Sequence, residues 1–419
     1  MGVVLTCERR RAFIPSGHPG LRVIRVSGLL DGIRVLDLSR VMAGPYCSMM
    51  LADLGAEVVK VERPGQGDDT RAWGPPFLGG ESAYFLSVNR TKKSVTVDLG
   101  RDEGREIALE LAAKSDVLLE NFSPGTADRL GLGYEAVARA NGAIVYCSIS
   151  GYGQDGPYRE WPAYDLILQG MGGLQGITGE PGRPPLRIGV AVADIAGGMF
   201  AAFAIVAALL RRERTGTGEC IDVSLLDSQL AWLTYMAGIF FATGQEPPRN
   251  GSKHPTIVPY ETFVTRDGHI NVAAGNDSIF RRLVRSIGHP ELADDPRFAT
   301  NRARVENRAT LEPVLEDIFV SGSTAEWLRR LRAGEVPCGP VYSLRDLVED
   351  PQIAARRLVL EMQHPTAGPI RQFGPPFRMK SSALASIAPP ILGQHTEEVL
   401  TSLGYAATKI AALRRDGVV

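Results

Sequence analysis

The sequence has almost no net charge and few cysteines and histidines, and each shortage excludes a kind of protein. Its 46 lysines and arginines balance 47 aspartates and glutamates, which leaves a formal net charge of −1. This balance offers no basic surface for nucleic acid. The five cysteines lie far apart without a CxxC pair, and the six histidines lack the spacing of metal ligands. We expect no metal site, and free thiols in a reducing cytoplasm, or in a mitochondrial matrix if the protein is eukaryotic.

The sequence predicts neither a membrane-spanning segment nor a secretory signal. The apolar stretch 195–210 is too short to cross a bilayer, and extending it back to residue 188 would place the Asp194 carboxylate in lipid. We therefore expect a buried helix and no membrane association. Residues 1–27 carry five arginines against one acid, Glu8, and lack the apolar core of a secretory signal. We interpret them as a disordered basic tail, although an upstream start codon and a transit peptide fit the same composition.

Apolar strands alternate with helices over the first half of the chain, which predicts an α/β protein with an open parallel sheet. Residues 32–65 contain an apolar strand, a loop, a helix and a second strand, which together form a βαβ unit. A helix is expected at 197–212, after a short extended segment at 188–193. Other strand-like segments lie at 93–99, 116–122 and 143–153.

The character of the chain changes after Gly244, where QEPPRNGSKHP reads as a linker. A smaller α+β unit with its own strands and amphipathic helices follows. The segment VPCGPV then leads back toward the first domain. The predicted organisation is a tail at 1–27, the N-terminal part of a large domain at 28–244, a small domain at 245–340, and a return segment completing the large domain at 341–419.

The opening βαβ unit suggests nucleotide binding but lacks the most specific motif for it. The turn SRVMAGPY holds one glycine, so the GxGxxG fingerprint of NAD-binding proteins is absent. Arg63 directly follows Glu62 at the end of the second strand, and an arginine there suits a phosphate. A surface ion pair would explain Arg63 equally well.

Two further places carry candidate binding or catalytic residues. Asn121 and Phe122 lie at the carboxyl end of a strand, where open α/β sheets bind ligands, and Arg129 follows shortly after. Asp194 is the one charged residue between 188 and 210, so it is a helix cap, half of a buried pair, or a working group. A carboxylate at a helix start stays ionised, as a nucleophile must. Asp165 in YDLILQG is a second acid, with an N-cap as its alternative role.

Taken together, these segments resemble the class III CoA-transferases, the CaiB/BaiF family. The resemblance spans nearly everything from residue 30 to the end. It rests on LDGIRVLDLSRVMAGPYCSMMLADLGAEVVKVERPGQGDDTR, NRTKKSVTVDL, DVLLENFSPGTADRLGLGY, AYDLILQGMGG, VAVADIAGGMFA, RTGTGECIDVSLLDS, VPCGPV and LGQHTEEVL.

The resemblance implies a reaction and a set of residues. Asp194 would be the nucleophile that attacks an acyl-CoA, forming first a mixed anhydride and then an aspartyl-CoA thioester. CoA thioesters would be substrates, with no permanently bound cofactor, and the Gly197–Gly198 pair would let acyl-CoA approach the backbone. The family's fold implies an interlocked homodimer of two ring-like chains. The implied CoA contacts are Val41, Arg63, Val97, Asn121, Phe122 and Arg129, and the implied acyl-site residues are Met42, Tyr84, Tyr164 and Asp165.

Differences between this sequence and those of related enzymes narrow the choice of substrate and reaction. Formyl-CoA transferases have a glutamine at the position of Met42 and a glutamate at that of Asp165, which puts formate and oxalate in doubt. Racemases of 2-methylacyl-CoAs have a histidine where this chain has Tyr164, so racemization is the alternative reaction. A non-catalytic CoA-binding protein is a third reading, which the presence of Asp194 disfavours.

The substrate prediction rests on residues 250–276 and 362–376, which look most like the succinyl-CoA:dicarboxylate CoA-transferases. That likeness suggests succinyl-CoA as donor and a dicarboxylic acid as acceptor. A second carboxylate needs a cationic or hydrogen-bonding partner, for which Arg71, Lys253 and His254 are candidates.

Overall fold

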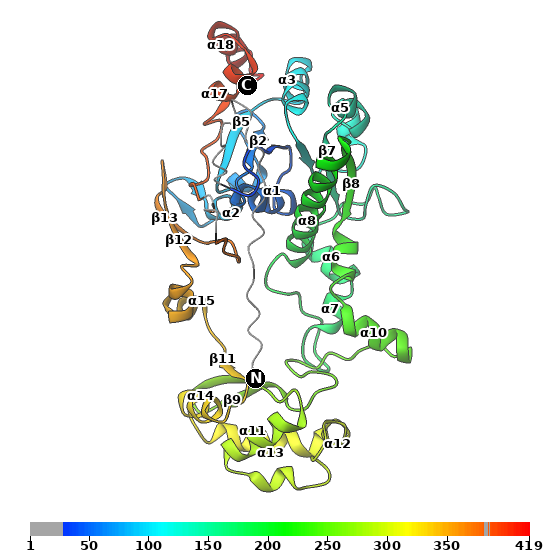
Figure 1. Ribbon diagram of the computed structural model, residues 1–419, viewed down its shortest axis with the longest axis vertical. Coiled ribbons are helices and arrows are strands. Elements are labelled where there is room, and N and C mark those ends of the chain that lie inside the picture. Colours follow the sequence, from blue (N-terminus) through cyan, green and yellow to red (C-terminus); the bar gives the residue numbers. More distant parts are fainter. Residues whose placement is uncertain (1–27, 381–383, 385) are drawn as a thin grey trace, which may run out of the picture.

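The computed structural model describes residues 28–380, 384 and 386–419, so the predicted basic tail at 1–27 lies outside the described residues. A six-stranded parallel sheet has the order β5-β2-β1-β6-β7-β8. It lies in the upper half of the molecule in the view of Figure 1. The predicted α/β class and parallel sheet are confirmed. The strands are β1 (Arg34–Asp37), β2 (Glu57–Glu62), β5 (Lys92–Thr96), β6 (Val117–Glu120), β7 (Val145–Ser150) and β8 (Glu219–Ser224).

The order of the strands reverses between β1 and β6. From β1 the chain adds β2 and β5 on one side, and then β6, β7 and β8 on the other. Loops leaving two neighbouring strands in opposite directions open a crevice at their carboxyl ends, where α/β proteins bind ligands. The loop after β1 (39–42) and the residues after β6 (121–122) lie at this crevice.

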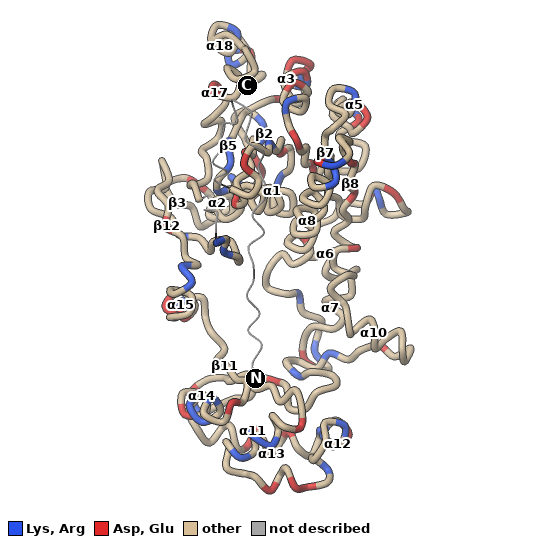
Figure 2. Tube along the Cα trace, in the orientation of Figure 1, with Lys and Arg blue, Asp and Glu red and all other residues tan. Residues whose placement is uncertain are grey.

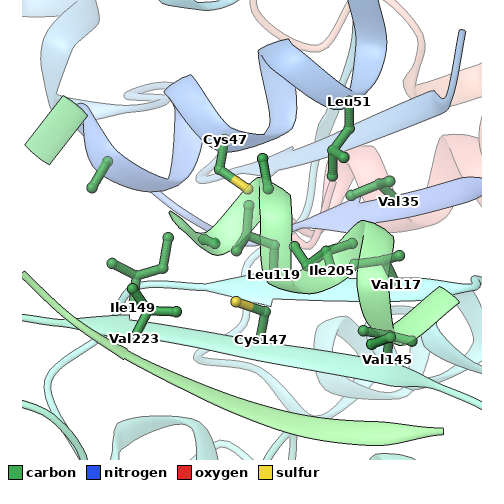
Figure 3. Packing of buried hydrophobic residues seen from close by; sticks show 14 of the residues in the cluster. Val35, Cys47, Leu51, Val117, Leu119, Val145, Cys147, Ile149, Ile205 and Val223 are labelled. Carbon is green, nitrogen blue, oxygen red and sulfur yellow. The ribbon is translucent and has the colours of Figure 1, made fainter. Parts of the chain in front are cut away.

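Helices cover both faces of the sheet. On one face, α1 (Ala43–Asp53) and α8 (Val192–Thr215) pack over a core that contains Cys47, Leu119, Cys147 and Ile205 (Figure 3). On the other face, α3 (Asp102–Ala113) and α5 (Tyr134–Ala140) share a core with the C-terminal helices α17 (Thr396–Leu403) and α18 (Ala407–Arg415). The sheet is therefore a buried middle layer, as parallel sheets require.

Helix α8 is longer than the sequence pattern predicted. It begins at Val192, so the expected extended segment at 188–193 is helical over its last two residues. With 24 residues it is long and apolar enough to cross a membrane by length and composition, and the prediction that the stretch is too short was wrong. Half of its most apolar window is buried within the protein, and it packs on α1 and the sheet, as a core helix does. Figure 2 shows it uncharged along most of its length, with basic residues at its end.

A second group of elements forms its own core at the far end of the molecule (Figure 1). Strands β9 (Tyr260–Thr265), β10 (Gly268–Ala273) and β11 (Cys338–Pro340) form an antiparallel sheet. Its helices are α11 (Asp277–Ile287), α12 (Asn301–Glu306), α13 (Arg308–Val320) and α14 (Thr324–Ala333), with the 3-10 turn η2 (Pro290–Ala293). The boundaries proposed for the small domain stay a prediction.

After β11 the chain returns to the central sheet. The hairpin β12 (Val359–His364) and β13 (Gly368–Phe373) precedes α17, whose Thr396 hydroxyl accepts the N–H of Thr96 in β5 at 3.0 Å. The remaining elements are η1 (Asp69–Ala72), β3 (Phe77–Leu78), β4 (Glu81–Ser82), α2 (Ala83–Val88), α4 (Thr126–Arg129), α6 (Asp165–Met171), α7 (Leu174–Ile177), α9 (Leu225–Leu230), α10 (Thr234–Thr243), α15 (Leu344–Glu349) and α16 (Pro351–Ala355).

Candidate active site

Two adjoining cavities lie at the crevice between β1 and β6. The first has a volume of about 420 Å³, and three residues predicted to bind CoA line it: Arg63, Val97 and Phe122. The second has a volume of about 280 Å³, and Asp194 lines it. Its walls also include Val41, Met42, Asn121 and Tyr164, together with Phe122.

The cavities share a boundary. Arg40, Asp69 and Phe122 line both of them. This arrangement fits a ligand with a bulky head and an arm that carries the reacting group. The Arg40 guanidinium lies half exposed at the junction, with one ion pair to Asp69 at 3.4 Å. Sequence reasoning missed Arg40, although its place just after a parallel strand was a usable signal.

Side chains from several elements hold the loop that forms the wall between the cavities. The Asn121 amide brackets the Arg40 peptide groups: its Oδ1 accepts the N–H of Arg40 at 2.8 Å, and its Nδ2 donates to the carbonyl at 2.7 Å. The N–H of Val41 donates to both carboxylate oxygens of Asp68 at 3.2 Å. Val41 has a φ of +71°, which is costly for a β-branched residue, so these bonds hold it in place.

A buried ion pair supports this loop from below. Lys60 and Asp68 have no exposed side-chain surface, and Lys60 Nζ lies 2.9 Å from the Asp68 carboxylate. The same ammonium donates to the carbonyl of Ser39 at 2.6 Å. The nearby Lys60 charge holds the pKa of Asp68 well below its usual range, against the opposing effect of burial. The amide of Asn121, which was predicted as a CoA contact, is hydrogen-bonded to the Arg40 backbone of the same loop.

Asp194 does not cap its helix. It is the third residue of α8, and its neighbour Ala193 donates its N–H to the Asp165 carboxylate, from α6, at 2.9 Å. Of the three roles left open for Asp194, the structure excludes that of the helix cap, which Asp165 takes instead. The Gln169 amide also donates to Asp165, at 2.8 Å. Because Asp165 accepts the N–H of Ala193, the Asp194 carboxylate is not used as a cap and lines the wall of the second cavity.

The protonation of Asp194 is unusual for a carboxyl group. Burial, followed by the nearby Asp165 charge, raises the pKa of Asp194 to about 7. Burial, followed by the negative charge of Asp194, raises the pKa of Tyr84 to about 12. The Tyr84 ring packs edge-on against Trp73, with 5.2 Å between ring centroids. Trp73 was not identified from the sequence, because no motif points to it.

The glycine pair after Asp194 has a different role from the one expected. A side chain on Gly197 would collide with Leu225 of α9, and one on Gly198 would lie 2.6 Å from the carbonyl oxygen of Ala43 in α1. These glycines let helices pack closely. The prediction that they allow acyl-CoA to approach the backbone was wrong.

Arg129 lies apart from the residues that line the cavities. Its exposed guanidinium donates to the Thr126 hydroxyl at 2.7 Å, and Thr126 lines the first cavity. Arg129 is thus next to that cavity without forming its wall.

The cations suggested for a second substrate carboxylate are engaged elsewhere. Arg71 makes two bonds to Glu62, at 2.7 and 2.8 Å, and is almost fully buried. Lys253 is surrounded by three glutamates, with distances from 2.7 to 3.5 Å. His254 Nδ1 accepts the N–H of Thr256, and burial lowers the pKa of His254. Within the part of the chain that the structure describes, no group of three metal-ligating side chains forms a site.

Comparison with known proteins identifies the family. The model of CoA-transferase family III matches residues 30–396. The succinyl-CoA:glutarate CoA-transferase of Mus musculus is 46% identical over 392 residues, which cover 93% of this chain and 90% of the relative. The acetyl-CoA:oxalate CoA-transferase of Acetobacter aceti is 44% identical over 80% of this chain and 86% of its own length. A crystal structure of a CaiB/BaiF family protein from Brucella suis superposes with a TM-score of 0.81 at 42% identity, covering 90% of this chain and all of that one. The chain therefore belongs to CoA-transferase family III.

Proposed function

We propose that the enzyme transfers CoA from succinyl-CoA to a dicarboxylic acid, with Asp194 as the nucleophile. The observation that carries this proposal is the position of the Asp194 carboxylate. Asp165, not Asp194, accepts the N–H at the start of α8, and Asp194 lines a cavity that adjoins a larger one. The names of two relatives support the acceptor class. Their donors differ, but glutarate and oxalate are both dicarboxylates.

The reaction balances without any other reactant. An oxygen of Asp194 attacks the thioester carbon of succinyl-CoA, which gives a mixed anhydride and CoA thiolate. The thiolate attacks the aspartyl carbon, releases succinate, and leaves an aspartyl-CoA thioester. The acceptor carboxylate then attacks this thioester and expels the thiolate, forming a second anhydride. Attack of the thiolate on the acceptor carbon releases the new acyl-CoA and regenerates the Asp194 carboxylate.

The surroundings of Asp194 suit a carboxylate nucleophile. Its raised pKa reflects poor solvation, so the ionised form is more reactive than a hydrated carboxylate. An anhydride hydrolyses readily, so partial burial at the cavity wall protects it. Tyr84, with its raised pKa, stays protonated at neutral pH and can donate its hydroxyl hydrogen to a developing negative charge.

CoA would occupy both cavities. The nucleotide would lie in the first, where the exposed Arg63 offers a cation for phosphate and Phe122 offers a ring face. The pantetheine arm would pass Arg40 and reach Asp194 in the second. Arg129, beside the first cavity, would add a further phosphate contact.

We also infer an interlocked homodimer. Large apolar side chains on α8 and α10 are exposed in the single chain, including Phe203 at 75% and Phe241 at 82%. Monomers rarely leave such clusters uncovered. The contacts of α17 with β5 close the chain into a ring that a second copy could thread.

Mass spectrometry of CoA esters tests the function. Purified enzyme is mixed with succinyl-CoA and a panel of carboxylic acids, with Asp194→Ala as control. A new acyl-CoA made only by the wild type supports the proposal and identifies the acceptor. Exchange of the α-proton with solvent, without transfer to any acid, would instead indicate a racemase.

A further inference from the structure

A dicarboxylate acceptor brings a charge that the reaction itself does not use. One carboxylate attacks the aspartyl thioester, while the other must lie near a site that already holds Asp165 and Asp194. An unpaired anion in a partly buried site is costly, so a nearby cation is needed. Arg71 and Lys253 are engaged with glutamates, and Arg40 lies at the boundary with the first cavity.

Arg187 is a half-exposed cation beside Asp165, the acid whose carboxylate accepts an N–H at the start of the helix that carries the nucleophile. Its guanidinium lies 3.7 Å from the Asp165 carboxylate, whose other oxygen accepts the N–H next to Asp194. Among the residues that the structure describes, it makes one further bond, at 3.3 Å, to the carbonyl of Gly189. Its side chain is 47% exposed, so several N–H donors remain free to meet a ligand.

The backbone around Arg187 is fixed by a buried side chain. Gln169 has no exposed surface, and its Oε1 accepts the N–H of Ile188 at 2.8 Å. Its Nε2 donates to the carbonyl of Val190 at 3.1 Å as well as to Asp165. One amide therefore ties the loop of Arg187 to the carboxylate that caps α8. A cation held in this way is preorganised relative to Asp194.

We propose that Arg187 binds the second carboxylate of the acceptor and thereby selects dicarboxylic acids. The inference rests on the proposed function. The guanidinium offers paired N–H donors that match a carboxylate, and its long contact with Asp165 leaves that edge unsaturated. The succinyl group of the donor carries the same distal carboxylate and would use the same arginine, so the test below holds succinyl-CoA at saturation for each variant.

Steady-state kinetics with matched acceptors tests this role. Glutarate and pentanoate have five carbons each and differ in the distal carboxylate. In Arg187→Met, we expect the KM for glutarate to rise about 10- to 100-fold, as for loss of a charged hydrogen bond, with a smaller change in kcat. Transfer to pentanoate should stay within about threefold of the wild type, and Arg187→Lys should restore part of the glutarate affinity. Arg183→Met changes an exposed arginine of the same loop and should leave both acids unaffected.

Three other results would count against the role proposed for Arg187. An unchanged KM for glutarate in Arg187→Met would overturn the proposal. So would an equal loss of transfer to glutarate and pentanoate with intact CoA binding, because Arg187 would then act through Asp165. If the wild type itself transfers CoA to no acid, the proposed function fails and the inference with it.

Discussion

At the scale of single residues, the raised pKa of Asp194 governs the pH dependence of the reaction. Only the ionised carboxylate attacks a thioester, and the pKa of Asp194 is about 7. We expect kcat/KM to rise with pH, with a midpoint near 7, and to level off above it. Initial rates with succinyl-CoA between pH 5.5 and 9 measure this. A profile already flat at pH 5.5 would show that the carboxylate is ionised at an ordinary pKa.

The same residue makes the protein less stable as pH rises. The folded state holds the Asp194 proton up to about pH 7, whereas an unfolded aspartate loses it near pH 4. Stability therefore falls between these values, by at most about 4 kcal/mol. We expect Asp194→Asn to be about 1–3 kcal/mol more stable than the wild type at pH 8 but not at pH 4. Urea unfolding at both values measures the difference, and a gain of equal size at both would show that the charge is not its cause.

Asn121 is predicted to stabilise the folded enzyme even when CoA is not bound. Its amide makes two bonds to Arg40, so Asn121→Leu should cost about 1–3 kcal/mol of stability and also weaken CoA binding. Arg63→Ala is the control, since an exposed phosphate contact should weaken CoA binding with no change in stability. Thermal unfolding of both variants, with and without CoA, separates the roles. If Asn121→Leu unfolds like the wild type without CoA, Asn121 is a plain ligand contact.

Sequence patterns could locate the site but not the partners of its residues. Ligands follow the carboxyl ends of parallel strands, which is why Asn121 and Phe122 could be anticipated, whereas Val41 was implied only by the family resemblance. The pairing of Asp165 with the N–H of Ala193 spans 28 positions and depends on how α6 meets α8. No local pattern encodes such a contact. The availability of Arg187 is likewise a property of the packed structure.

At the scale of elements, the crossing of α1 and α8 depends on a glycine. A methyl group on Gly198 would lie 2.6 Å from the Ala43 carbonyl oxygen and 3.3 Å from the Cys47 nitrogen. Since both are backbone atoms, the helices must move apart, and we expect Gly198→Ala to cost about 1–3 kcal/mol. Chemical denaturation measures the loss.

Gly238 provides the matched control for that substitution. It lies within α10, and a methyl group there would meet nothing within 4 Å. Gly238→Ala should gain up to about 1 kcal/mol, because alanine favours the helix. Equal effects of the two substitutions would show that helix propensity, and not the close crossing, controls stability at Gly198.

The limits of the elements were harder to predict than their existence. The sequence predicted a helix that begins at residue 197, but α8 begins at Val192. Packing against α1 and α9 outweighs the weak helix propensity of glycine. Helices α9 and α10 are separated by a break between Leu230 and Thr234. Nothing in that local sequence, which has no proline or glycine, marks the break.

At the scale of the whole molecule, contacts between distant parts of the chain close a ring. Thr96 and Thr396 are 300 positions apart, yet their hydroxyl oxygens lie 3.0 Å from each other. The N–H of Asp98 donates to the carbonyl of Val418 at 2.8 Å, and side chains of α17 and α18 complete the core beside β5. Between these ends, the chain runs to the second core and back (Figure 1).

A covalent closure of this ring gives a direct test of the interlocked homodimer. Cysteines at positions 96 and 396 replace two adjacent hydroxyl groups, so a disulfide within each chain is expected. Two threaded rings closed in this way cannot separate even when unfolded. On a denaturing gel without reductant, the double variant should run as a dimer, and reductant should convert it to a monomer. Thr96→Cys alone controls for disulfides between subunits and should run as a monomer in both conditions. If the oxidised double variant also runs as a monomer, with its disulfide verified by mass spectrometry, the two chains do not pass through each other.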